Sequence, residues 1–172
     1  MLELGRSGAA GAARREHPVL HDGAVVARLR PAAWREAATA TVGNCDWVFR
    51  SSGLGLVGRR AEAAADERGL WVEPTSVWRH SWRGKLQGTR VELHPVSTWQ
   101  CTYRVVVAGA DVGTGGSTGG WRPRPTLTVG DGVPLDQQVF LLWVLLLAGW
   151  QFHRIGPAPW VAGLAAAVIG GR

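Results

Sequence analysis

The sequence predicts a mainly β protein built from short antiparallel hairpins, arranged as a meander or a barrel, with one buried helix near the C-terminus. Apolar and polar side chains alternate with a period of two in many short runs, which is typical of half-buried strands. Turn residues interrupt these runs about every eight to twelve positions, the spacing of successive hairpins. Residues 139–150 depart from this pattern because they are apolar on every side, and they predict a helix enclosed by other elements.

The length and composition fit one folded domain. A chain of 172 residues can bury roughly 70% of the surface that its unfolded form exposes. Hydrophobic residues make up 46% and charged residues 19%, as in globular domains, and the ten tryptophans predict many half-buried sheet positions. We expect a flexible lead-in over residues 1–16, a barrel domain over 17–152 and an apolar tail over 153–172.

The clearest hairpin spans residues 78–93, with a two-residue turn at Gln87-Gly88. Its tryptophans and leucines alternate with charged residues, so one face is predicted to point into the core and the other into solvent. In the run that starts at Cys45, the side chains of Cys45, Trp47 and Phe49 are expected to point inward. Strands are also predicted at residues 24–30, 37–42, 45–50, 99–107 and 124–129, whereas the glycine-rich residues 113–120 are expected to form a loop.

The apolar segment that follows is predicted to be a core helix rather than a membrane span. Pro134 fits the first turn of a helix, and Asp136 suits the positive end of the helix dipole. Twelve residues of helix span about 18 Å, whereas the hydrocarbon core of a bilayer is about 30 Å thick. A short helix that is apolar on every side is best buried inside the β-structure.

The order of these elements resembles the tubby-like C-terminal superfamily, which includes the tubby, phospholipid scramblase and LURP-one-related proteins. The resemblance covers about residues 17–150. It implies a closed antiparallel barrel threaded by a hydrophobic C-terminal helix at residues 135–150. It is carried by the Trp-rich hairpin Ser76–Leu93, the glycine-rich loop, the strand Arg124–Val129 and the run Val133–Trp143.

The resemblance implies a non-catalytic binding or scaffold protein, because tubby domains bind phosphoinositides and scramblases are linked to calcium and lipid movement. No site residue of the family can be transferred, since neither a phosphoinositide pocket nor an acidic calcium loop is matched residue by residue. Asp111 and Asp131, for example, are isolated and lack the oxygen ligands at every second position that an EF-hand loop supplies.

The candidate binding residues are therefore taken from the predicted hairpin. Arg79, Arg83 and Lys85 share the polar face of its first strand, and Arg90 projects from the second strand onto the same side. Guanidinium groups bind phosphate bidentately, so an anionic phospholipid headgroup or a phosphorylated ligand is the partner hypothesis. The alternative interpretation is a solvated face that Glu92 partly neutralises. Nucleic acid is disfavoured because the tryptophans point to the opposite face.

The main alternative function is a nicotinamide-dependent oxidoreductase. Gly53, Gly55 and Gly58 form a G-x-G-x-x-G sequence, and Glu73 follows 20 residues after the first glycine. This interpretation requires a helix over residues 59–68, with its N-terminus at the pyrophosphate. Against it, the following hundred residues predict hairpins without another βαβ unit.

No catalytic or metal-binding constellation is indicated, and an enzyme is the less favoured class. The five histidines form no H-x-x-x-H pair, and Cys45 and Cys101 lie in no CxxC motif. The N-terminal residues lack the apolar run of a signal peptide. These features predict a cytoplasmic protein, peripheral to the membrane under the lipid hypothesis. The formal charge of +6 favours anionic partners in general.

Overall fold

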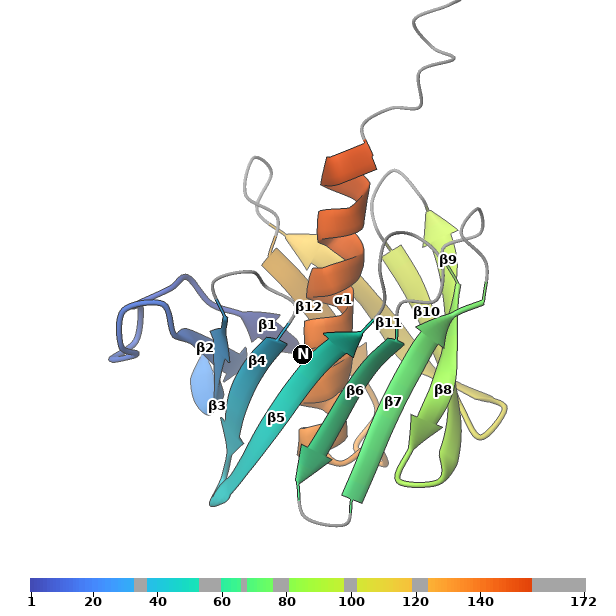
Figure 1. Cartoon of the computed structure of the whole chain (residues 1–172), viewed down its shortest axis with the longest axis horizontal. Coiled ribbons are helices and arrows are strands. Elements are labelled where there is room, and N and C mark those ends of the chain that lie inside the picture. Colours follow the sequence, from blue (N-terminus) through green and yellow to red (C-terminus); the bar gives the residue numbers. More distant parts are fainter. Residues whose placement is uncertain are drawn as a thin grey trace, which may run out of the picture.

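Twelve strands and one helix form a closed antiparallel barrel with the helix inside it (Figure 1). The structure is a computed structural model. It describes residues 1–32, 37–52, 60–65, 68–75, 81–97, 102–118 and 124–155. The elements are β1 Leu2–Leu4, β2 His17–His21, β3 Ala24–Pro31, β4 Ala37–Val42, β5 Cys45–Ser52, β6 Arg60–Ala65, β7 Arg68–Pro74, β8 Trp82–Leu86, β9 Thr89–Ser97, β10 Thr102–Val107, β11 Ala110–Thr118, β12 Arg124–Val129 and α1 Leu135–Ile155.

The barrel closes through its shortest strand. Each strand pairs with the next one along the chain, and β1 pairs with β2 on one side and with β12 on the other. Leu2 therefore lies opposite His21 of β2 and Leu127 of β12. Closure supplies partners for backbone groups that would otherwise be exposed along a sheet edge. The predicted class, a closed antiparallel barrel around a C-terminal helix, is confirmed.

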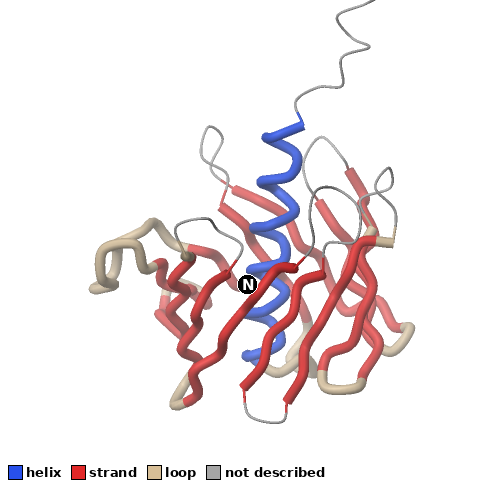
Figure 2. The backbone as a smooth tube through the Cα atoms, viewed as in Figure 1, coloured by secondary structure: helices blue, strands red, loops and turns tan. Residues whose placement is uncertain are grey.

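The two ends of the barrel differ. At one end, which we call the turn end, neighbouring strands are joined by tight turns, drawn tan at the bottom of Figure 2. In the predicted turn Gln87-Gly88 both residues have positive φ, 49° and 89°, as a two-residue type I′ hairpin turn requires. The first turn of α1 lies there too, because Gln87 Nε2 donates to Asp136 Oδ2 at 3.3 Å. The opposite end, where α1 leaves the barrel, is called the exit end.

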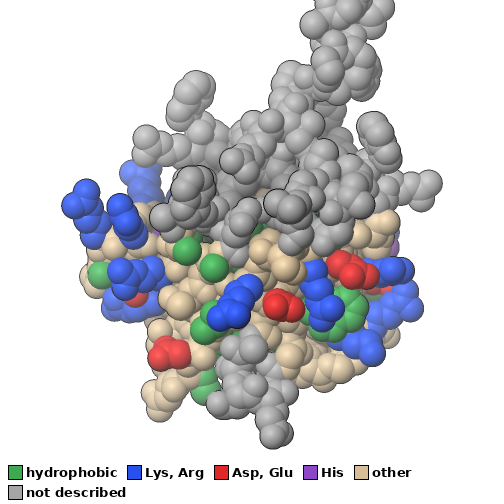
Figure 3. All heavy atoms as spheres, viewed as in Figure 1, with side chains coloured by type: hydrophobic (Ala, Val, Ile, Leu, Met, Phe, Trp, Pro, Cys, Tyr) green, Lys and Arg blue, Asp and Glu red, His purple; other side chains and the backbone are tan. Residues whose placement is uncertain are grey.

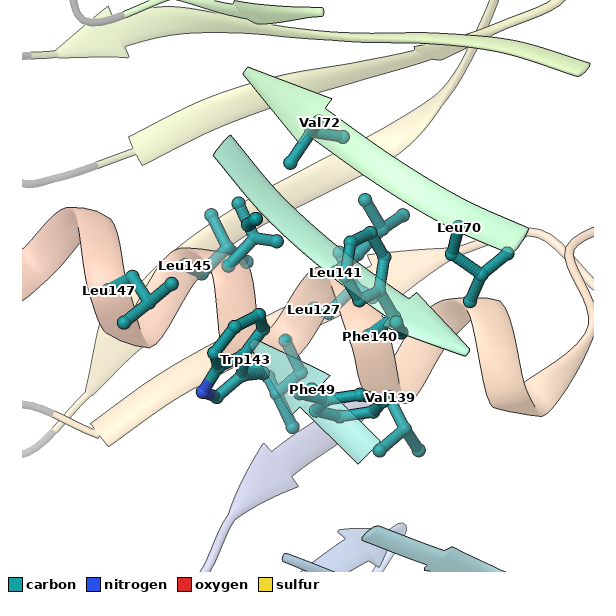
Figure 4. Packing of buried hydrophobic residues seen from close by; sticks show 14 of the residues in the cluster. Phe49, Leu70, Val72, Leu127, Val139, Phe140, Leu141, Trp143, Leu145 and Leu147 are labelled. Carbon is teal, nitrogen blue, oxygen red and sulfur yellow. The ribbon is translucent and has the colours of Figure 1, made fainter. Parts of the chain in front are cut away.

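The helix α1 fills the interior of the barrel, and residues 139–144 are completely buried. Its aromatic side chains meet Phe49 of the barrel wall (Figure 4): the Phe49 ring lies 5.2 Å from the Trp143 ring and 5.7 Å from the Phe140 ring, centroid to centroid. The prediction of a buried core helix is confirmed. The described part of the chain contains no membrane-spanning helix.

The predicted alternation of the strands is also confirmed where the structure describes it. Trp47 and Phe49 of β5 are buried, with Cys45 half-buried, and Trp82 and Leu86 of β8 point inward. The turn at Gln87-Gly88 joins β8 to β9, and β4 and β12 match their predicted bounds. The inward side chains of the strands and those of α1 form one continuous core.

Three sequence predictions are corrected. Residues 113–118, expected to be a loop, belong to strand β11. Glycine is needed in this strand because the helix packs closely against it: a Cβ on Gly115 would lie 2.5 Å from Leu145 Cδ1. The barrel begins at β1 rather than at residue 17, and Gly5–Glu16 is a hydrogen-bonded loop. The boundary expected after residue 152 falls inside α1, which continues to Ile155.

Candidate functional site

The predicted basic face lies on the outside of the barrel, on β8 and β9. We call Arg83, Lys85 and Arg90 the hairpin face; all three side chains are exposed. The register places Lys85 opposite Arg90 and Arg83 opposite Glu92. The structure therefore brings these three predicted residues together, whereas Arg79, the fourth, lies outside the described residues.

The charges of the hairpin face are largely balanced. Arg83 Nε lies 3.5 Å from Glu73 Oε1 of β7, and Arg90 forms an ion pair of 2.5 Å with Glu92. A 2.8 Å hydrogen bond with His94, supplemented by the charge of Arg90, lowers the pKa of Glu92, so this carboxylate stays ionised. Of the three cations, only Lys85 has no ionic partner among the described residues. The geometry thus agrees with the alternative interpretation of a partly neutralised solvent face.

The residues of the dinucleotide hypothesis do not form its expected framework. The dinucleotide hypothesis requires a helix over residues 59–68. This prediction is wrong, because residues 60–65 form strand β6, which pairs with β5 and β7. Glu73 lies on the outer face of β7 and pairs with Arg83. Gly53, Gly55 and Gly58 lie outside the described residues. Without a helix N-terminus after the glycines, the pyrophosphate has no dipole to bind.

A groove of about 490 Å³ lies on the outer face of β5, β6 and β7. Arg60 covers the indole of Trp71, with its central guanidinium carbon 4.6 Å from the ring centroid. The same guanidinium lies 3.7 Å from a carboxylate oxygen of Glu62. The face of Trp71 and the charge of Arg60 are therefore already engaged within the chain. Arg50 also lines the groove and has no ion pair with a described residue, so the groove holds one unpaired arginine, fewer than the cluster described next.

A second group of cations lies on β3 and on the loop between β1 and β2, on the left of the view in Figure 3. We call Arg6, Arg14, Arg15, Arg28 and Arg30 the arginine cluster. Arg28 and Arg30 face outward because they alternate with the buried Ala27 and Leu29. The other three arginines lie in the loop and are exposed.

The loop is held against β2 and β3 by hydrogen bonds. Gly5 N donates to Pro18 O at 2.8 Å, and Gly8 N donates to Glu16 O at 2.9 Å. Arg28 Nη1 lies 3.1 Å from both Gly11 O and Glu16 Oε2, so one guanidinium links the strand to the middle and to the C-terminal end of the loop. These contacts tie the loop that carries Arg6, Arg14 and Arg15 to β2 and, through Arg28, to β3.

Glu16 is the only carboxylate among the described residues that contacts the arginine cluster, and it pairs with Arg28 alone. Arg6, Arg14, Arg15 and Arg30 have no ion pair with any described residue. Like charges on one surface repel one another, so a bound anion would stabilise the group. The arginine cluster is therefore more strongly basic than the hairpin face.

We expect the anchor of this loop to weaken in acid. The Ala13 amide donates to Glu16 Oε2, and this bond, followed by the one from Arg28, lowers the pKa of Glu16. A lowered pKa means that the contact stabilises the fold above the unfolded-state pKa, and that this contribution is lost as the pH falls through the folded-state pKa. An NMR titration of the Ala13 amide should therefore show a midpoint below the ordinary range of glutamate. In Arg28→Ala the midpoint of this titration should rise, because the hydrogen bond from Arg28 to Glu16 is lost. An unchanged midpoint would show that Arg28 does not lower the pKa of Glu16.

Sequence reasoning missed the arginine cluster because the two parts are far apart in the chain. The Arg14-Arg15 pair stands in a Gly- and Ala-rich segment, which was interpreted as a flexible lead-in. The alternation of Arg28 and Arg30 with Ala27 and Leu29 was a usable signal for an outward basic strand face. Only the hydrogen bonds that fold the loop onto β3 join the two.

Among the described residues, no three His, Cys, Asp or Glu side chains are grouped so that they could hold a metal ion. Comparisons with protein-family models, with curated proteins and with solved structures found no match to this chain. The geometry of the described residues is therefore the basis for inferring a function.

Proposed function

We propose that this chain is a non-catalytic binding module of tubby-like type whose arginine cluster binds a phosphate-bearing anion. The phosphate can come from the headgroup of an anionic phospholipid or from a soluble phosphorylated molecule. The observation that carries the proposal is the charge imbalance: of the five arginines on β3 and on the loop between β1 and β2, only Arg28 forms an ion pair with a described carboxylate, that of Glu16. Guanidinium groups suit phosphate because their planar N–H donors match two of its oxygens.

The tubby-like part of the proposal rests on the resemblance of the sequence. The resemblance implies an antiparallel barrel threaded by a hydrophobic C-terminal helix, and α1 inside the twelve strands has this arrangement. The binding part rests on the arginine cluster and not on the barrel, since one fold can serve many functions. The site also differs from the hairpin face, whose arginines have acidic partners.

The test is co-sedimentation with vesicles of neutral lipid, with and without phosphoinositide. We expect the wild type to bind only the anionic vesicles. Each basic residue near an anionic surface contributes about 1 kcal/mol, so Arg14→Glu/Arg15→Glu should weaken binding by at least about 30-fold. The matched control, Lys85→Glu/Arg90→Glu, makes the same charge change on the hairpin face and should keep most of the binding.

Soluble inositol trisphosphate separates the two sources of phosphate. If it binds the wild type directly but the vesicles do not, the ligand is a soluble phosphorylated molecule. Binding that survives in Arg14→Glu/Arg15→Glu and is lost in the control would instead assign the site to the hairpin face and refute the proposal. Absence of binding to both probes would also refute it.

A further inference from the structure

The groove on the outer face of β5, β6 and β7 is open at one point because Gly69 of β7 has no side chain. These strands stand at the front of the view in Figure 1. Gly69 is exposed, and a Cβ at this position would meet nothing within 4 Å. The volume of about 490 Å³ falls in the range of small-molecule sites, roughly 300–1,000 Å³. The groove is therefore large enough for a small organic molecule.

The groove offers apolar surface on two of its strands. Val48 of β5 is 42% exposed, although it is an apolar residue. Trp71 of β7 is half-buried, and the guanidinium of Arg60 lies on one face of its indole. A guanidinium is planar and weakly hydrated, so the outer side of Arg60 can itself stack on a second ring. These surfaces favour a ligand with a flat apolar body.

The charge that is not balanced in the groove is that of Arg50 on β5. The register places Arg50 opposite Glu62, so the two side chains project from neighbouring positions on the same face. Glu62 nevertheless forms its ion pair with Arg60, at 3.7 Å. Arg50 is exposed and has no ion pair with a described residue. Its planar N–H donors can therefore bind a carboxylate of a ligand through two hydrogen bonds.

We propose that this groove binds a small aromatic carboxylate, with its carboxylate on Arg50 and its ring over Gly69, between Val48 and Trp71. Glu62 sets the charge of the ligand, because it lies across from Arg50 and repels a doubly charged phosphate more strongly than a singly charged carboxylate. The groove lies on β5 to β7, apart from the arginine cluster on β3 and its loop. The inference therefore goes beyond the proposed function and does not depend on it.

The test is an NMR titration of the full chain with cinnamate, compared with uncharged cinnamyl alcohol and with cinnamyl phosphate. We expect cinnamate to shift the amide signals of β5 and β7, and to bind more tightly than either comparison probe. Arg50→Gln removes the charge and its hydrogen bonds to the carboxylate, so it should weaken binding at least about 10-fold. Arg30→Gln is the matched control, since it removes an exposed arginine of β3 that also has no ion pair with a described residue, and it should bind as the wild type does.

Gly69→Leu tests the place of the ring separately from the charge. The new side chain occupies open space, so the variant should fold and lose the binding of cinnamate. If Gly69→Leu does not fold, Arg50→Gln decides alone, because it changes an exposed side chain. Wild-type affinity in either folded variant would overturn the proposal, and so would the absence of any shift at millimolar cinnamate. Loss in Arg30→Gln instead would assign the carboxylate to the arginine cluster, and tighter binding of cinnamyl phosphate would refute the carboxylate class.

Discussion

Replacing Gly84 with alanine is expected to destabilise the barrel by about 3 kcal/mol or more. Gly84 faces inward from β8, opposite Val72 of β7. A Cβ at this position would lie 1.9 Å from the Trp71 carbonyl oxygen and 2.6 Å from Val72 Cα. Both are backbone atoms, so the two strands would have to separate. Denaturant unfolding followed by tryptophan fluorescence measures the loss.

Gly69→Ala is the matched control, since Gly69 lies on β7 and a Cβ there would meet nothing within 4 Å. We expect its free energy of unfolding to stay within about 0.5 kcal/mol of the wild type. Equal stability of the Gly84→Ala and Gly69→Ala variants would show that β7 and β8 do not approach as closely as described.

Truncating Trp143 to alanine should cost about 4 kcal/mol, because it opens a large cavity at the centre of the core. The side chain is completely buried in α1 and packs against Phe49 and Phe140. A typical domain is stable by about 5–15 kcal/mol, so much of the total would be lost. The midpoint of denaturant unfolding measures the effect.

Trp143→Phe separates packing from hydrogen bonding at this position. The Trp143 Nε1 atom is buried and has no hydrogen-bond partner among the described residues. Phenylalanine keeps most of the ring volume and removes the unpaired N–H. The Trp143→Phe variant should therefore lose much less of the free energy of unfolding than Trp143→Ala. An alanine variant as stable as the wild type would mean that α1 is not enclosed by the barrel.

The hairpins and the buried helix could be predicted because their signals are local. Alternation in Trp82–Leu86 and the turn at Gln87-Gly88 lie within a few residues of one another. The apolar character of residues 139–150 on every side favoured a helix enclosed by other elements, although α1 extends beyond this run to 21 residues. These features depend on the period of the sequence and not on which distant segments meet.

Two strands escaped prediction for different physical reasons. β1 has only three residues, too few to show a period, and its role in closing the barrel depends on pairing with β12, more than 120 residues later. β11 is rich in glycine, which usually indicates a loop. Here Gly113 and Gly115 are required because the Thr128 carbonyl and the Leu145 side chain approach them closely.

The candidate site was predicted only in part. The alternation placed Arg83, Lys85 and Arg90 on one face correctly, but the pairing of Arg83 with Glu73 depends on the register of β7 and β8. The arginine cluster depends on a loop folding back onto β3 through Arg28. Neither of these can be obtained from the period of one segment.

The measurement that tests the central claim most directly is the affinity for phosphoinositide vesicles at two ionic strengths, compared between the wild type and Arg14→Glu/Arg15→Glu. The structure predicts that the wild type binds more tightly than the variant, and that this difference shrinks as salt screens the arginine cluster. Equal affinities at low salt, or equal binding of the wild type to neutral vesicles, would contradict the assignment of the arginine cluster as the binding site.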